Sequence, residues 1–207
     1  MSNFFDPIFL IKVLGPAGIF TMVFIESGLF FGFFFPGDSL LFTSGLLVAS
    51  GFFQFFYIFA GCAIAAFLGG LFGYLFGEQI GPAIFSRHDS IFFHRKHIDE
   101  THGYFSKYGN NTIFLARFLP IVRTFAPILA GVGKMKYSNF ILYNFAGAVV
   151  WSFMLIGGGY YLGKIVPNID KYILPIVVLI IVVSFSPALY QIFKKRRSKN
   201  KLIKIDS

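Results

Sequence analysis

Four charged residues lie in otherwise apolar segments, and their types are those that bind anions and carry protons. Glu26 and Asp38 are twelve residues apart, and Arg117 and Arg123 lie within "ARFLPIVRTFAPILAG" at 116–131. A guanidinium group can bind a phosphate through two parallel N–H···O bonds. A carboxylate in a low-dielectric cavity has its charged form disfavoured, so it can take up a proton. We therefore expect Arg117 and Arg123 to bind phosphate, and Glu26 and Asp38 to couple protons or to gate.

The composition indicates that these charges lie in a membrane. The chain of 207 residues is 56% hydrophobic and only 13% charged, whereas soluble domains have about 25% charged residues. No charged residue occurs between Asp38 and Glu78, between Lys136 and Lys164, or between Lys171 and Lys194. A helix crosses the hydrocarbon core with about 20 residues. The sequence therefore predicts an integral membrane protein.

The net charge of +9 is concentrated at the C-terminus. The stretch "KKRRSKNKLIK" at 194–204 holds seven of the 18 basic residues. Basic residues directly after an apolar segment favour the cytoplasmic side, so we expect a cytoplasmic C-terminus and no role in nucleic-acid binding. Residues 1–193 are predicted to form one transmembrane domain, and 194–207 a basic cytoplasmic tail. The single cysteine, Cys62, excludes an internal disulfide.

A first helical hairpin is predicted at about 16–50. Residues 39–77 would form a helix about 58 Å long, nearly twice the hydrocarbon core, so the chain must turn back, at "SGFFQ" (50–54). Pro36 and Gly37 are the predicted hinge, because proline removes a donor and glycine permits a sharp turn. The hairpin would be re-entrant and would place Asp38 near mid-depth. Broken backbone at that depth must lie in protein or face a wet cavity.

A second re-entrant hairpin is predicted at about 110–133, with hinges at Pro120 and Pro127. It would bring both arginines to the same cavity rather than into lipid. Transmembrane helices are expected at 55–77, 137–163 and 172–192. Trp151, in the middle of the second of these, is expected to serve in packing.

A short internal repeat links the two halves. "GYxxG" occurs at 73–77 and again at 159–163, and the same offset of 86 relates Gly45 to Gly131. We therefore expect an all-α polytopic membrane protein of two inverted repeats, each a re-entrant hairpin followed by a transmembrane helix. An amphipathic surface helix at 78–109 would lie between them, and a further transmembrane helix would follow.

Other functions compete with phosphate binding. The four charges could form purely structural ion pairs, or Glu26 and Asp38 could bind the ion of a proton-coupled cation exchanger. A structural membrane organiser would need no substrate. A membrane-embedded phosphatase is disfavoured because the histidines (88, 94, 97 and 102) lie only in the surface region. His94 and His97 with Glu100 could bind a metal, but a solvated helix explains them equally well, so no metal and no cofactor are expected.

The residues resemble a known family. "FIESGLFFGFFFPGDSLLFTSGLL", "FLGGLFGYLFGEQIG" and "ARFLPIVRTFAPILAGVGKMKYSNFILYNFAGAVVW" are similar to the DedA family, also called SNARE-associated or VTT-domain membrane proteins. The resemblance covers about residues 15–165. The acidic pair of that family matches Glu26 and Asp38, and its arginine pair matches Arg117 and Arg123; these residues are needed for function in the family. Glu78 departs from the family pattern, which often has a basic residue after "GYxxG".

The resemblance implies lipid translocation. Bacterial members are similar to carriers that return undecaprenyl phosphate to the cytoplasmic leaflet of the inner membrane for envelope synthesis, driven by the proton motive force. Others are linked to phosphatidylethanolamine flipping, and eukaryotic relatives scramble phospholipids. The sequence leaves open which lipid is carried, whether transport is energised, whether the chain forms a homo-oligomer and on which side the N-terminus lies.

Overall fold

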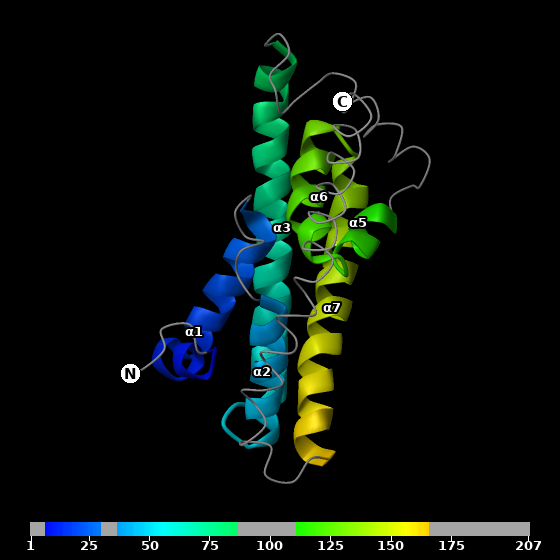
Figure 1. Ribbon diagram of the computed structural model, residues 1–207. Coiled ribbons are helices and arrows are strands. Elements are labelled where there is room, and N and C mark those ends of the chain that lie inside the picture. Colours follow the sequence, from blue (N-terminus) through cyan, green and yellow to red (C-terminus); the bar gives the residue numbers. More distant parts are fainter. Residues whose placement is uncertain (1–6, 30–36, 87–110, 166–207) are drawn as a thin grey trace, which may run out of the picture.

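The computed structural model describes residues 7–29, 37–86 and 111–165, and all the regular elements in these ranges are α-helices (Figure 1). They are α1 (Pro7–Gly28), α2 (Gly37–Ala49), α3 (Phe55–Ser86), α5 (Asn111–Ala116), α6 (Pro120–Val132) and α7 (Tyr137–Ile165). The predicted hinge Pro36, the segment 172–192 and the tail 194–207 lie outside the described residues. The all-α prediction is confirmed for the part described.

Two long helices are the axis of the molecule. The segments Phe55–Ile80 and Tyr137–Ile165 are long and apolar enough to cross a membrane. α3 continues nine residues beyond Gly77, where the predicted span ends, so residues 78–86 belong to this helix and not to a separate surface helix. The 23 residues from Phe55 to Gly77 already rise about 34 Å, enough for the hydrocarbon core. Glu78 is exposed at the end of that stretch, so its charge does not require the helix to stop.

The two short helices, α2 and α6, have 13 residues each, about 20 Å, and neither could cross a bilayer alone. Both end in the same hydrogen-bonded turn. Phe52 N–H donates to the Leu47 carbonyl oxygen after α2, and Met135 N–H donates to the Ala130 carbonyl oxygen after α6. This is the Schellman pattern. Its left-handed position is taken by Gly51 (φ 80°) in the first case and by Lys134 (φ 49°) in the second.

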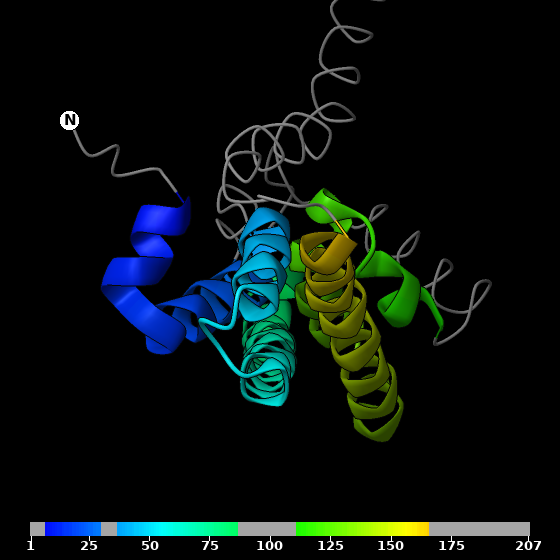
Figure 2. The ribbon, with the colours of Figure 1, turned by 90° about the horizontal axis from the view of Figure 1, so that it is seen from below.

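Each short helix packs on the long helix that belongs to the other half of the chain. α2 packs mainly on α7, and α6 packs mainly on α3. In Figure 1, α2 lies in the lower half of the molecule and α6 in the upper half, and the view from below in Figure 2 shows α2 between α1 and α7. Both short helices begin near the middle of the molecule and run towards opposite ends.

Glycines allow the backbones to approach closely at both crossings. A Cβ atom on Gly159 of α7 would collide with the Phe42 carbonyl oxygen of α2. A Cβ atom on Gly77 of α3 would collide in the same way with the Ile128 carbonyl oxygen of α6. These residues belong to the two "GYxxG" segments, so the sequence repeat marks the two crossings. Small residues at membrane helix interfaces commonly serve this purpose.

Two helix breaks differ from the sequence predictions. The turn at 50–54 is confirmed, since α2 ends at Ala49 and α3 begins at Phe55. Pro127, predicted as a hinge, lies inside α6, which continues across it. The break falls earlier, at Arg117–Leu119, where Pro120 supplies the first helical residue and needs no intrahelical N–H partner. The sequence analysis missed a kink in α1 at Gly15 (φ 61°), directly before Pro16.

The close packing of α2 on α7 predicts that alanine substitutions at two neighbouring glycines have very different effects on stability. Gly159→Ala should destabilise the protein by about 1–3 kcal/mol, because its methyl group has no room beside Phe42. Gly157→Ala is the matched control, since a Cβ atom there meets nothing within 4 Å. The measurement is the thermal unfolding midpoint of each variant purified in detergent micelles. Equal midpoints for the two variants would contradict the crossing.

Candidate functional site

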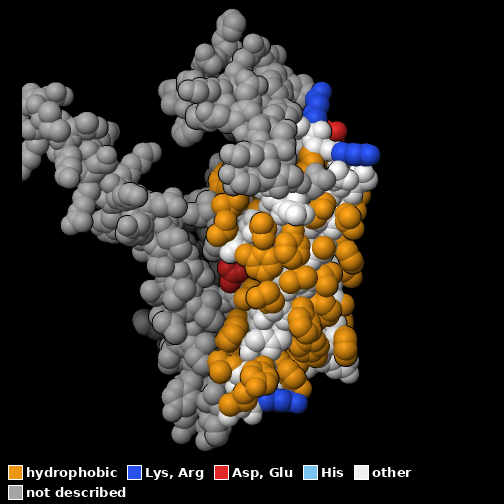
Figure 3. Space-filling model, turned by 90° about the vertical axis from the view of Figure 1, so that its right-hand side faces the viewer, with side chains coloured by type: hydrophobic (Ala, Val, Ile, Leu, Met, Phe, Trp, Pro, Cys, Tyr) orange, Lys and Arg blue, Asp and Glu red, His pale blue; other side chains and the backbone are white. Residues whose placement is uncertain are grey.

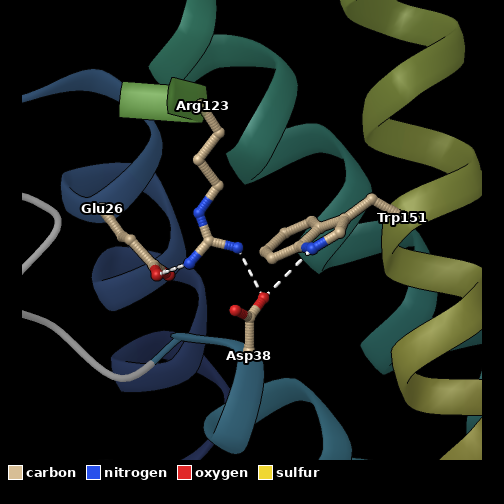
Figure 4. Close-up of polar contacts among 4 residues, drawn as sticks. All are labelled: Glu26, Asp38, Arg123 and Trp151. Atoms are coloured by element: carbon tan, nitrogen blue, oxygen red, sulfur yellow. Dashed lines mark hydrogen bonds and ion pairs between the residues drawn. The ribbon is translucent and has the colours of Figure 1, made fainter. Parts of the chain in front are cut away.

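Arg123 is the centre of the site. It lies in the first turn of α6, and its side chain is 6% exposed. Its Nη1 donates to Asp38 Oδ1 over 2.5 Å, and its Nη2 donates to Glu26 Oε1 (Figure 4). The two acids come from the last turn of α1 and the first turn of α2. One guanidinium therefore joins the ends of three helices. We call Glu26, Asp38 and Arg123 the triad.

The depth of the triad follows from α7. Trp151, which contacts Asp38 and Arg123, lies fourteen residues from either end of this helix. At a rise of 1.5 Å per residue it is about 21 Å from each end. The triad is therefore at mid-height, where the sequence analysis places Asp38.

Glu26 is the most buried member of the triad. It is 0% exposed, and its carboxylate lies directly against the Gly37 backbone, where a Cβ atom would collide with it. Gly37, predicted as a hinge, is the first residue of α2 and permits this close approach. The free amides at a helix N-terminus favour an anion. The start of α2 is therefore an environment suited to a negative group.

Trp151 completes the surroundings of the triad. Its indole Nε1 donates to Asp38 Oδ1 over 3.1 Å, and the Arg123 guanidinium carbon lies 4.8 Å from the indole ring centre (Figure 4). Trp151 does pack in the buried core, as the sequence predicts, but its contacts with Asp38 and Arg123 were not predicted. No local pattern in the sequence distinguishes this tryptophan from a packing residue, because its partners are more than 25 residues away along the chain.

Arg117 does not join the triad. Its Nη2 donates to the Ala66 carbonyl oxygen (2.9 Å) and to Asn144 Oδ1 (2.6 Å), and Asn144 Nδ2 donates to the Phe67 carbonyl oxygen (3.0 Å). The side chain passes over Gly147, where a Cβ atom would come within 2.8 Å of Arg117 Cδ. Arg117 therefore ties α3 to α7. The expectation that four charges meet is met by three of them, and the assignment of Arg117 to phosphate stays a prediction.

Asn144 is a second residue that the sequence analysis missed. It is fully buried and lies seven residues before Trp151 on α7. Seven residues are almost two helical turns, so the two side chains share a face. A polar amide inside an apolar helix was a signal that could have been noticed.

Two members of the triad have unsatisfied polar atoms. Within the described residues, four buried side-chain atoms have no side-chain hydrogen-bond partner: Glu26 Oε2, Ser27 Oγ, Arg123 Nε and Ser152 Oγ. Each belongs to the triad or to a chain neighbour of Glu26 or Trp151. Buried polar groups are usually satisfied, and a catalytic or binding role is one explanation for exceptions. The triad therefore has spare hydrogen-bonding capacity at Glu26 Oε2 and Arg123 Nε.

No group of three metal-ligating side chains is found among the described residues. All four histidines lie at 88–102, outside those ranges, so the expectation of no metal stays a prediction.

Comparison with known proteins gives the family. The family model of the VTT domain matches residues 35–161, which include Asp38, Arg117, Arg123 and Trp151, whereas Glu26 precedes them. The chain belongs to the VTT-domain, or DedA, family of membrane proteins. No solved structure matches it.

Several relatives cover most of the chain. Protein DedA of Escherichia coli K12 is 39% identical over 182 residues, 87% of this chain and 83% of its own. The uncharacterized membrane protein Rv0364 of Mycobacterium tuberculosis H37Rv is 41% identical over 215 residues, 96% of this chain and 91% of its own. The inner membrane protein YqjA of Escherichia coli K12 is 30% identical over 175 residues, 78% and 77% of the two chains. The resemblance to this family is thereby confirmed.

The triad predicts that the stability of the protein depends strongly on the balance of charges at Glu26, Asp38 and Arg123. Arg123→Met should destabilise the protein by about 3–5 kcal/mol, because two buried acids lose their partner. The triple variant Glu26→Gln, Asp38→Asn, Arg123→Met should recover most of that loss. Thermal unfolding in micelles measures both, with the exposed Lys134→Met as control. A triple variant no more stable than Arg123→Met would contradict this account.

The contact of Arg117 with Asn144 gives a separate prediction. Asn144→Leu removes the side-chain acceptor of a buried guanidinium and should cost about 1.5–3 kcal/mol. Ser138→Ala, at an exposed position in the first turn of α7, is the control. Unfolding midpoints in micelles should fall for Asn144→Leu alone, and equal midpoints would show that this bond contributes nothing.

Proposed function

We propose that the protein carries a lipid phosphate across the membrane, with undecaprenyl phosphate as the first candidate and a phospholipid as the second. The observation that supports this most is the triad: a buried guanidinium at mid-height, shared by two acids, with spare hydrogen-bonding atoms around it. A phosphate oxygen accepts hydrogen bonds as a carboxylate does. A lipid phosphate could therefore replace an acid at Arg123.

The ends of the two short helices would also assist an anion. α2 and α6 both begin at the triad, so their free backbone amides are close to Arg123. Half-length helices whose N-termini face an anionic substrate are known from secondary transporters.

The crossed packing supports an inverted repeat. The short helices run from the triad towards opposite ends, and each packs on the long helix of the other half. In this proposal α1–α2 and α5–α6 are re-entrant hairpins that enter from opposite faces, and their alternate movement opens the site to one side at a time. The crossing glycines Gly77 and Gly159 would be where each hairpin slides or rocks.

The exterior suits a lipid whose tail stays outside. Figure 3 shows a face that is mainly hydrophobic, with an acidic side chain at its middle height, basic side chains at both ends and a further acidic one at the upper end. Exposed apolar side chains follow α3, and they include Ile64, Leu68, Phe72 and Phe76. Only the headgroup of a lipid would have to enter the polar site.

Arg117 is proposed as a second phosphate ligand. Its guanidinium is bound to Ala66 and Asn144 in this structure, so its contribution requires that contact to open. The two acids are proposed to exchange protons with the carried phosphate. A carrier is favoured over an enzyme because no histidine occurs in the described ranges and Cys62 is packed in the apolar core.

The orientation is proposed from the basic residues. Lys134 and Lys136 are exposed in the turn between α6 and α7, which packs near the end of the α3 span, since Gly131 lies against Glu78. Basic turns favour the cytoplasm. We place this end, together with the tail 194–207, on the cytoplasmic side of a bacterial inner membrane, in a multi-pass arrangement.

Reconstitution in liposomes tests the function. The purified protein should transfer undecaprenyl phosphate between leaflets, and Arg123→Lys should lower the rate by more than about tenfold, because lysine lacks the bidentate fork. Lys164→Arg, at an exposed site on the far end of α7, is the matched control. Phosphatidylethanolamine is assayed in parallel to identify the lipid.

Two results would overturn the proposal. Transfer of neither lipid by a folded protein would exclude a lipid carrier. Transport of sodium or potassium ions that needs the two acids but no lipid would instead indicate a cation exchanger.

A further inference from the structure

We propose that the two acids have different tasks: Asp38 stays ionised as the fixed counter-ion of Arg123, Glu26 takes up and releases the proton, and Trp151 is the positioning residue that divides them. The transport part of this inference rests on the proposed function, whereas the assignment of the proton to Glu26 can be tested without any substrate.

Asp38 is surrounded by donors. Its Oδ1 accepts hydrogen bonds from Arg123 Nη1 (2.5 Å) and from Trp151 Nε1 (3.1 Å). An indole N–H can only donate, so it favours the negative form of its acceptor. The indole ring also lies 4.8 Å from the Arg123 guanidinium carbon, close enough for a cation–π contact. Trp151 therefore holds both the cation and the anion of this pair in place.

Glu26 is the more buried of the two acids, with 1% of its side chain exposed against 17% for Asp38. Its Oε1 accepts from Arg123 Nη2, and its Oε2 lies against the Gly37 backbone without a side-chain donor. Burial disfavours the charged form of a carboxylate, and it does so most for the acid that is shut off from water. Between the two acids of the triad, Glu26 is thus the one that the surroundings allow to be neutral.

The charged groups around Glu26 come from two helices. They are Asp38 on α2 and Arg123 on α6. From α3, two titratable side chains pack on α1: Cys62, within an apolar cluster that includes Val23, and Tyr57, whose ring packs against Phe20. No other described acid or base faces this carboxylate from these helices.

The net charge of the triad indicates how a proton on Glu26 would affect the binding of phosphate. With both acids ionised the triad carries one net negative charge, which opposes an incoming phosphate. A proton that binds Glu26 from water makes the triad neutral and loosens the hold of Glu26 on the Arg123 Nη2 edge. A phosphate oxygen can then accept from that edge while Asp38 keeps the other. The proton and the phosphate therefore bind together and leave together, which is symport.

Infrared spectroscopy of the lipid-free protein in nanodiscs tests the proton assignment. The C=O stretch of a protonated carboxylic acid should appear in the wild type as the pH falls. This titrating band should be absent from Glu26→Gln. In Trp151→Phe, which keeps an aromatic ring but loses the donor, a second band should appear as Asp38 begins to titrate. Phe153→Leu, an exposed aromatic position on the same helix, is the control and should match the wild type.

Transport in liposomes tests the coupling. A pH gradient should accelerate undecaprenyl phosphate transfer by the wild type, and Glu26→Gln should lose this acceleration. Asp38→Asn should lose exchange as well, because Arg123 no longer has its fixed partner. Trp151→Phe should shift the pH profile of transfer, which a purely structural residue would not do.

The outcomes separate the two proposals. A titrating band that persists in Glu26→Gln and disappears in Asp38→Asn would overturn the division of tasks, as would a Glu26→Gln variant still accelerated by the gradient. Wild-type protein that shows the expected infrared titration but transfers no phosphate lipid would overturn the proposed function and leave the proton assignment standing.

Discussion

The structure depends on one guanidinium buried in an apolar molecule. An isolated arginine at this depth would be costly, so Arg123 must be paired, and its two partners come from two other helices. The ion pairs therefore fix where α1 ends, where α2 begins and where α6 begins. Buried salt bridges add little net stability compared with apolar packing, although breaking one is costly. A site of this kind is better explained by its use than by its contribution to folding.

The long helix α7 positions both arginines. Asn144 accepts from Arg117, and Trp151 contacts Arg123, so two residues on one face of α7 hold two arginines that are six residues apart. Glycines set the distances: Gly147 leaves room for the Arg117 side chain, and Gly159 lets α2 approach with Asp38 at its start. α7 is the common reference for the arginines and for the acid of α2. Any movement of α2 along α7 would change the geometry of Asp38 and Trp151 together.

The sequence predicted the parts of this arrangement that depend on length and local chemistry. The turn at 50–54 follows from an apolar run too long for the bilayer, and the break before Pro120 follows from its missing N–H. The four charges were found because they are rare in apolar segments. Trp151 and Asn144 were missed because their roles arise from contacts with residues distant along the chain. For the same reason, nothing local indicated that Arg117 bonds to Ala66 rather than to an acid.

The number of charges distinguishes a purely structural ion pair from a site that binds and releases a charged group. A structural ion pair is most stable with one cation and one anion, because any excess charge is uncompensated in a low-dielectric interior. The triad has two acids and one arginine, and the second arginine is engaged elsewhere by neutral acceptors. Local neutrality would therefore require one more positive charge, and in the proposed mechanism that charge is a proton. An odd charge, held at mid-height between two oppositely directed short helices, is what the proposed carrier would need in order to bind and release a proton.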